Sequence, residues 1–253
     1  MKKHLSVFML SASFAFWPTL IVSLLGAAGS FAWLYSLRGS ENSNYMLGSE
    51  LFSQLMIPIY VGVALLFILL TLNMRERGGV QPGYTLRRLG VDERTVFIWQ
   101  AVVGALSFFI FMMFQAAVCF FYGLWLQNQG LGVAGNLSVL VGFVNGLYTH
   151  AMLPLGDLPV YLRMLVVYLT LGAAVAYASF MGRRGKTAIS PFVVLAAALV
   201  LMAFQAQVAS YTYEIIAIGT GAIICWCFWA SISGRLKDDD NEVVQSPQGG
   251  TEE

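Results

Sequence analysis

The sequence is poor in charged residues, which make up 11% of its 253 residues. A soluble globular protein carries about 25%, so the surface of this chain is not built to face water on all sides. Hydrophobic residues reach 58% and gather in long blocks, as expected of helices that each need about 20 apolar residues to cross a bilayer. These blocks lack the short period-2 segments of membrane β-strands. The composition therefore predicts an all-α integral membrane protein.

Residues that bind metals or act as nucleophiles are also scarce. The chain has three cysteines and two histidines, and Cys119, Cys225 and Cys227 all fall inside apolar blocks. Cys225 and Cys227 are two positions apart, which places them on different faces of a helix and argues against a shared metal. The formal net charge is +1, so no charge surplus points to nucleic acid. We expect no catalytic residue, metal, cofactor or nucleic-acid partner in this chain.

The apolar blocks predict six transmembrane helices. An amphipathic segment at 1–13 precedes the first span, and Pro58 predicts a kink in the second. Residues 235–253 are polar, acidic and rich in Gln, Gly and Pro, which is typical of a disordered tail. The predicted spans cover residues 14–37, 51–72, 95–126, 160–181, 189–209 and 213–233.

The basic residues indicate the orientation of these spans. With the amino terminus in the cytoplasm, 12 of the 14 Lys and Arg residues fall on the cytoplasmic side, as the positive-inside rule requires. Only Arg38 and Arg163 then lie outside. A seventh crossing at 136–152 would move five basic residues to the outside, so we interpret the external segment 127–159 as carrying a re-entrant or surface helix. We expect a multi-pass protein of a cell membrane, such as a bacterial inner membrane, with both termini cytoplasmic.

The cytoplasmic loop 73–94 contains the most informative motif. Gln81-Pro82-Gly83 ends the preceding structure and permits a new helix, in which apolar and charged residues alternate. Asp92 is placed to cap the helix that becomes the third span. This pattern predicts a short helix on the inner membrane face, hinged at Gly90 and able to pass force from a cytoplasmic partner. An ordinary basic loop anchored to anionic lipid headgroups is the alternative.

The run Tyr84-Thr85-Leu86-Arg87-Arg88-Leu89-Gly90-Val91, followed by Glu93-Arg94-Thr95-Val96-Phe97, resembles the region after the second span of ABC type 2 permeases. These are the membrane subunits of ATP-binding-cassette exporters, and the six-span layout is similar too. The resemblance implies a coupling helix that docks on a separate ATPase subunit, which binds ATP and Mg²⁺, and a second membrane subunit, identical or related. In many relatives, however, the external re-entrant element lies between the last two spans. The implied contacts to the ATPase are Tyr84, Leu86, Arg87, Arg88, Leu89, Val91 and Glu93.

One stretch of this chain is similar to part of a nucleotide-binding motif. Gly185-Lys186-Thr187 matches the end of a P-loop, but that motif needs a glycine where Phe180 stands. The stretch also follows a predicted membrane helix, whereas a P-loop follows a strand. We therefore expect ATP hydrolysis in a partner subunit and no enzyme activity in this chain.

Few polar side chains lie inside the predicted spans. Arg163 and Glu214 fall at the outer ends, while Gln115, Gln205 and Gln207 either line a transport path or bond to a neighbouring helix. The low charge favours an apolar or amphipathic cargo, such as a lipid, a peptide or a hydrophobic toxin.

Two other classes of function stay open from the sequence. One is an ATP-independent transporter or channel, which a buried acidic residue or broken helices in related halves would favour. The other is a non-transporting sensor or assembly subunit of the membrane.

Overall fold

The computed structural model describes residues 2–37, 55–73, 91–128, 158–204 and 211–245, and the structural statements below concern these residues. Within them the chain forms helices and no strand. The helices are α1 (Lys2–Leu37), α3 (Met56–Asn73), α5 (Glu93–Asn128), α8 (Leu158–Arg183), α9 (Ser190–Phe204) and α10 (Tyr211–Gln245).

Four of these helices are long and apolar enough to cross a membrane, namely those over His4–Leu37, Glu93–Trp125, Leu158–Arg183 and Thr212–Leu236. The apolar parts of α3 and α9 are shorter and border parts of the chain outside the described residues. The predicted all-α fold is therefore confirmed for the described residues, with four helices that could each cross a membrane. The exact six-span topology stays a prediction.

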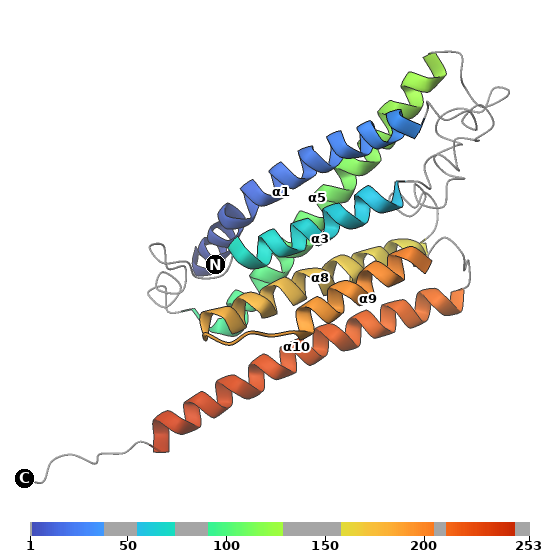
Figure 1. Cartoon of the computed structure of the whole chain (residues 1–253). Coiled ribbons are helices and arrows are strands. Elements are labelled where there is room, and N and C mark those ends of the chain that lie inside the picture. Colours follow the sequence, from blue (N-terminus) through green and yellow to red (C-terminus); the bar gives the residue numbers. More distant parts are fainter. Residues whose placement is uncertain (1, 38–54, 74–90, 129–157, 205–210, 246–253) are drawn as a thin grey trace, which may run out of the picture.

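The six helices run alternately in opposite directions, so the start of α1 and the end of α10 lie at the same end of the bundle (Figure 1). The start of α5, the end of α8 and the start of α9 also lie there. We call this the basic end, because eight of the nine basic residues in the described part of the chain belong to it, Arg163 being the other. The eight are Lys2, Lys3, Arg94, Arg183, Arg184, Lys186, Arg235 and Lys237.

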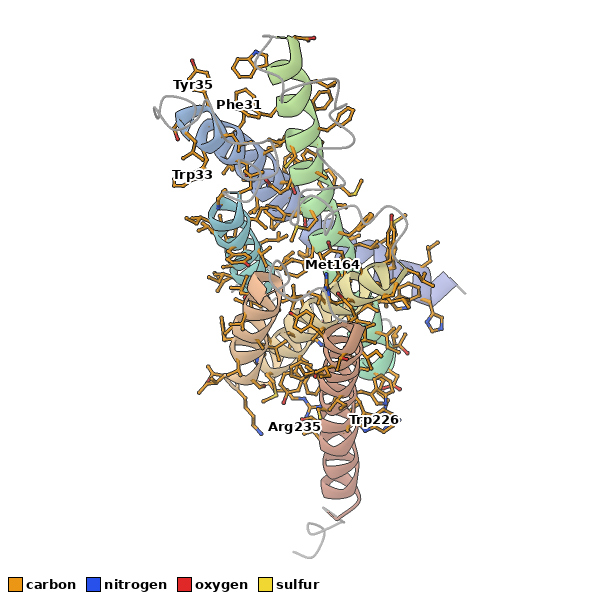
Figure 2. All side chains as sticks on the ribbon, turned by 90° about the vertical axis from the view of Figure 1, so that its right-hand side faces the viewer. Phe31, Trp33, Tyr35, Met164, Trp226 and Arg235 are labelled. Atoms are coloured by element: carbon orange, nitrogen blue, oxygen red, sulfur yellow. The ribbon has the colours of Figure 1, made fainter. Side chains whose placement is uncertain are left out.

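α8 is the central helix of the bundle. It packs against α5, α10, α9 and α3, and most of its residues are buried. α1 and α10 lie at the edges, where they expose large apolar side chains such as Trp226 at 70%. Figure 2 shows Trp33, Tyr35 and Trp226 on the outside of the bundle. Apolar side chains exposed along whole helices fit a surface that faces lipid.

Glycines of α5 and α8 bring these two helices into close contact. A Cβ atom on Gly104 would lie 2.9 Å from the Cα of Gly172, and one on Gly172 would overlap the backbone of Ala101 and Ala105. Small residues permit such an approach, which is a common way for helices to associate in lipid. This crossing fixes α5 against the centre of the fold.

The ends of two helices differ from the sequence-based expectation. The predicted amphipathic segment 1–13 is not a separate element, since α1 runs without a break from Lys2. The disordered tail predicted from residue 235 is wrong as far as Gln245, where α10 ends. Polarity alone does not stop a helix, and this stretch holds no proline or glycine until Pro247.

The kink predicted at Pro58 stays a prediction, because residues 51–54 of that span lie outside the described residues. Pro58 is the third residue of α3, in the first turn, where a missing backbone N–H costs no intrahelical hydrogen bond.

Candidate functional site

The predicted coupling helix directly precedes α5 in the sequence. Its residues Tyr84, Leu86, Arg87, Arg88 and Leu89, and the hinge at Gly90, lie outside the described residues. The structure does describe Val91, which precedes the helix, and Glu93, its first residue. The start of α5 is where the described part of the chain meets the predicted helix, and the contacts made there form the candidate site.

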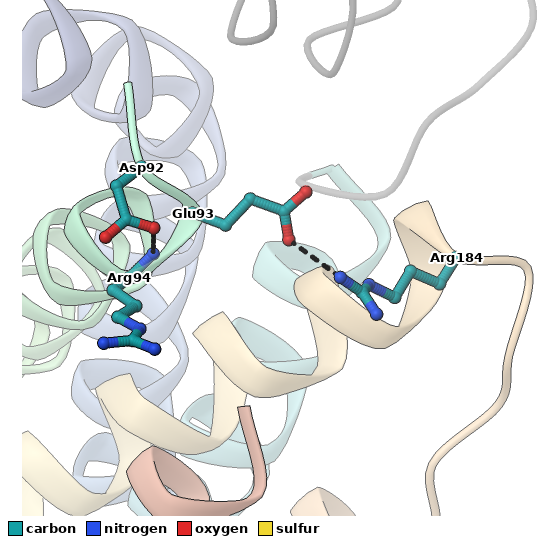
Figure 3. A network of polar contacts seen from close by, with 4 residues as sticks. All are labelled: Asp92, Glu93, Arg94 and Arg184. Atoms are coloured by element: carbon teal, nitrogen blue, oxygen red, sulfur yellow. Dashed lines mark hydrogen bonds and ion pairs between the residues drawn. The ribbon is translucent and has the colours of Figure 1, made fainter. Parts of the chain in front are cut away.

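Asp92 caps the start of α5, as the sequence predicted. One carboxylate oxygen of Asp92 accepts a hydrogen bond from the backbone N–H of Arg94 at 3.2 Å (Figure 3). Its backbone carbonyl accepts the N–H groups of Thr95 and Val96 at 2.9 and 3.2 Å. An aspartate in this position satisfies a donor at the helix start and favours its positive dipole end. The first turn of α5 is thus well ordered where the loop enters.

An ion pair joins this first turn to the end of α8. The guanidinium of Arg184 lies 3.4 Å from a carboxylate oxygen of Glu93 (Figure 3). The same guanidinium lies over the ring of Phe180, 4.5 Å from its centroid. Both charged side chains are partly exposed, so the pair contributes at most about 1 kcal/mol of stability. The ion pair instead determines which part of α8 lies beside Glu93.

A second polar contact lies seven residues, or about two helical turns, further along α5. Arg183 donates to the side-chain oxygen of Gln100 at 3.2 Å and to the hydroxyl of Ser179 at 3.3 Å. Gln100 is buried, so this bond lies in a region of low dielectric, where losing one partner is costly. Adjacent arginines of α8 therefore hold α5 at two positions about two turns apart.

A neighbouring side of the start of α5 packs on the amino-terminal part of α1. Val7 and Val96 are buried against each other, with Val91 and Trp99 beside them. The rings of Phe8 and Trp99 meet edge to face at 5.5 Å between centroids, a favourable aromatic geometry. Residues 2–13, predicted as a separate amphipathic segment, thus hold the start of α5 from a second direction.

Together these contacts define what we call the basic-end junction: the start of α5 with Val7 and Phe8 of α1 and Arg183 and Arg184 of α8. The junction binds the entry point of the loop 73–94 to an edge helix and to the central helix at once. A displacement of Val91 and Glu93 would move three helices together, because each is held by side-chain contacts in this region.

Of the three amides predicted to line a path, only Gln115 lies in the described part of the chain. Its side chain is fully buried, and its oxygen accepts a hydrogen bond of 2.6 Å from the hydroxyl of Ser30 on α1. Tyr122 forms a similar link, donating to the carbonyl of Leu34 at 3.0 Å. Gln115 thus bonds a neighbouring helix, the second of the two roles considered for it. Gln205 and Gln207 lie outside the described residues.

An apolar groove of about 470 Å³ runs between α5 and α8, within the range of about 300–1,000 Å³ typical of small-molecule sites. Its walls include Phe109, Met112, Met113, Leu165 and Tyr168. No metal site accompanies it: in the described ranges, no three His, Cys, Asp or Glu side chains lie close enough together to hold an ion. The external segment predicted at 127–159 falls almost wholly outside those ranges.

Sequence reasoning missed one contact, the ion pair between Arg163 of α8 and Glu214 of α10. Both residues were assigned to the outer ends of their spans without a partner being predicted, and Arg163 is 3% and Glu214 is 8% exposed. The available signal was an arginine and a glutamate, each just inside an apolar block. Opposite charges in such positions pair inside membrane proteins.

Comparison with known proteins identifies no relative, since no family model, no curated protein and no solved structure matches the chain.

Proposed function

We propose that the chain is the membrane permease subunit of an ATP-driven exporter, coupled through its first cytoplasmic loop to a separate ATPase subunit. The proposal combines the motif at residues 84–97 with the basic-end junction that follows it. A loop that only anchors lipid needs no rigid connection to the bundle. Here the loop enters a capped helix that is held by α1 and α8 within two turns.

In this proposal the basic end faces the cytoplasm, because eight basic residues gather there and cytoplasmic ends of membrane proteins carry the excess of Lys and Arg. ATP binding draws two ATPase subunits together, and the helix at residues 84–93 moves with them. The junction passes this motion to α5 and α8. One chain supplies one wall of the path, so a second membrane subunit, identical or related, completes it.

The apolar groove between α5 and α8 is consistent with an apolar or amphipathic cargo. Its lining carries no charged residue, so we propose that the cargo presents a hydrocarbon or aromatic surface. A lipid, a hydrophobic peptide or a hydrophobic toxin fits this description.

Co-purification tests the coupling proposal. The tagged chain is expressed in its native cell and purified in mild detergent, and an ATP-binding-cassette ATPase is sought among the co-purified proteins by mass spectrometry. We expect one ATPase to be retained. We expect R87E/R88E to reduce its recovery at least about tenfold, because the reversed charges would face groups of like charge across the docked surface. The double variant R75E/R77E is the matched control, because it reverses two charges in the same loop outside residues 84–93.

Two results would overturn the proposal. One is the absence of any co-purified ATPase from a correctly folded chain. The other is equal loss in both double variants, which indicates a general charge effect and not a docking helix.

A second candidate function is an ATP-independent transporter, which the buried carboxylate of Glu214 favours. Ionisable groups inside a membrane often mark ion or proton pathways. Glu214 is engaged by Arg163, however, and a paired carboxylate near a helix end is a poor proton carrier. A chain that transports in vesicles without any ATPase would establish this alternative.

A further inference from the structure

α8 and α10 meet along a regular seam of three contacts. Arg163 pairs with Glu214, the Thr170 hydroxyl approaches the carbonyl of Gly221 at 3.4 Å, and Tyr177 stacks on Phe228 with 4.7 Å between centroids. In every contact the two residue numbers differ by 51. On each helix the contacts are seven residues apart.

Constant spacing of this kind requires two parallel helices, and Figure 1 shows α8 and α10 running in the same direction. A seven-residue period is the packing repeat of left-handed, parallel coiled coils. The buried residues of α10 agree with it, since they form a single stripe down the helix. The stripe consists of Glu214, Ala217, Gly221, Phe228 and Ile232.

The three contacts differ in how strictly they set the position of α10 along α8. Thr170 also reaches the sulfur of Cys225 at 3.7 Å, and Tyr177 reaches the hydroxyl of Ser231 at 3.1 Å, so each already touches two successive turns of α10. The Arg163–Glu214 pair does not tolerate such a shift of α10. If α10 moved by four residues so that Ile218 took the place of Glu214, Arg163 would face an aliphatic side chain.

Such a displacement is costly because the pair lies within the bilayer. With α8 centred in the membrane, Arg163 is about 11 Å from the midplane, inside a hydrocarbon half-thickness of about 15 Å. A charge separated from its partner there is strongly disfavoured. A single buried polar residue fixes the register of soluble coiled coils by the same principle.

We propose that Arg163 and Glu214 are positioning residues that set the register of α10 on α8. α10 depends on this seam because α8 is its principal neighbour, with only a minor contact to α5. The pair thus holds α10 near one end of α8, and the basic-end junction holds α5 near the other end. This inference does not rest on the proposed transport function.

Disulfide cross-linking to the native Cys225 tests the register. In a C119A/C227S background of the full chain, we compare T170C with V166C, one helical turn apart on α8. Disulfides require Cα atoms within about 7 Å, and position 170 already contacts Cys225. We expect T170C to cross-link at least about tenfold more than V166C, since one turn displaces the partner by about 6 Å.

R163A is expected to abolish this preference, because α10 then slips or detaches. The charge swap R163E/E214R is expected to restore the preference for T170C. A matched control is T220A, which alters an exposed residue of α10 and should leave the preference unchanged.

Retention of the full preference in R163A would overturn the proposal. Should R163A fail to fold, the swap decides alone: a folded swap variant with the native preference supports the proposal, and a swap variant that misfolds or cross-links equally at both positions refutes it.

Discussion

The two ion pairs of α8 invite comparison, because they join one helix to different neighbours at opposite ends of the bundle. Arg184 and Glu93 connect α8 to α5 at the basic end, with side chains 23% and 39% exposed. Arg163 and Glu214 connect α8 to α10 at the other end, with side chains 4% and 11% exposed. The same pair of groups is thus placed in two different dielectric environments.

Burial changes what each pair contributes. The partly exposed pair gains little from its attraction, since water already solvates both charges. The buried pair gains little in net stability either, but breaking it leaves a lone charge in a medium of low dielectric. The Arg163–Glu214 pair therefore disfavours other positions of α10 along α8.

The largest effect that this comparison predicts is for R163A. Loss of one partner of the buried pair should lower the free energy of unfolding by about 3–5 kcal/mol, measured by titrating the purified chain with SDS in mixed micelles. The double variant R163M/E214L should be neutral or more stable than the wild type, because it removes both charges together. A double variant as unstable as R163A would show that packing, and not the lone charge, is responsible.

A change at the glycine crossing of α5 and α8, which lies between the two ion pairs, should have an intermediate effect on the free energy of unfolding. G172A places a methyl group against the backbone of Ala101 and Ala105, and we expect a loss of about 1–3 kcal/mol in the same titration. G219A is the control, since a Cβ there meets no atom within 4 Å. Because alanine favours helix, G219A should be neutral or stabilising by up to about 1 kcal/mol. Equal losses in both variants would contradict the close crossing.

The smallest effect is expected at the basic end. E93Q should cost less than about 1 kcal/mol, and the difference from the wild type should shrink in 1 M salt, where the Debye length is about 3 Å. E76Q removes the same charge from the loop 73–94 and controls for the change in net charge. A loss in E93Q as large as that in R163A would end the distinction between the two pairs.

The helices themselves could be predicted from local sequence, because each apolar block is long enough to require one. Asp92 could also be predicted as a cap, since its bond partner is two residues away. The partner of Glu93 could not be predicted, because Arg184 is 91 residues further along the chain. The end of α10 was mistaken because polar composition was taken as a sign of disorder, whereas Arg235–Gln245 lacks any helix breaker.

The sequence by itself determined that this chain forms apolar helices suited to a membrane. It also placed the basic residues at the start of some of these helices and at the end of others. Both properties follow from the transfer of short segments between water and lipid, which depends on nearby residues alone. Only the tertiary structure decided that α8 is central and that Arg163 faces Glu214. Helices already inside lipid gain no further hydrophobic energy by meeting, so neighbours are selected by glycine contacts and polar pairs between distant parts of the chain.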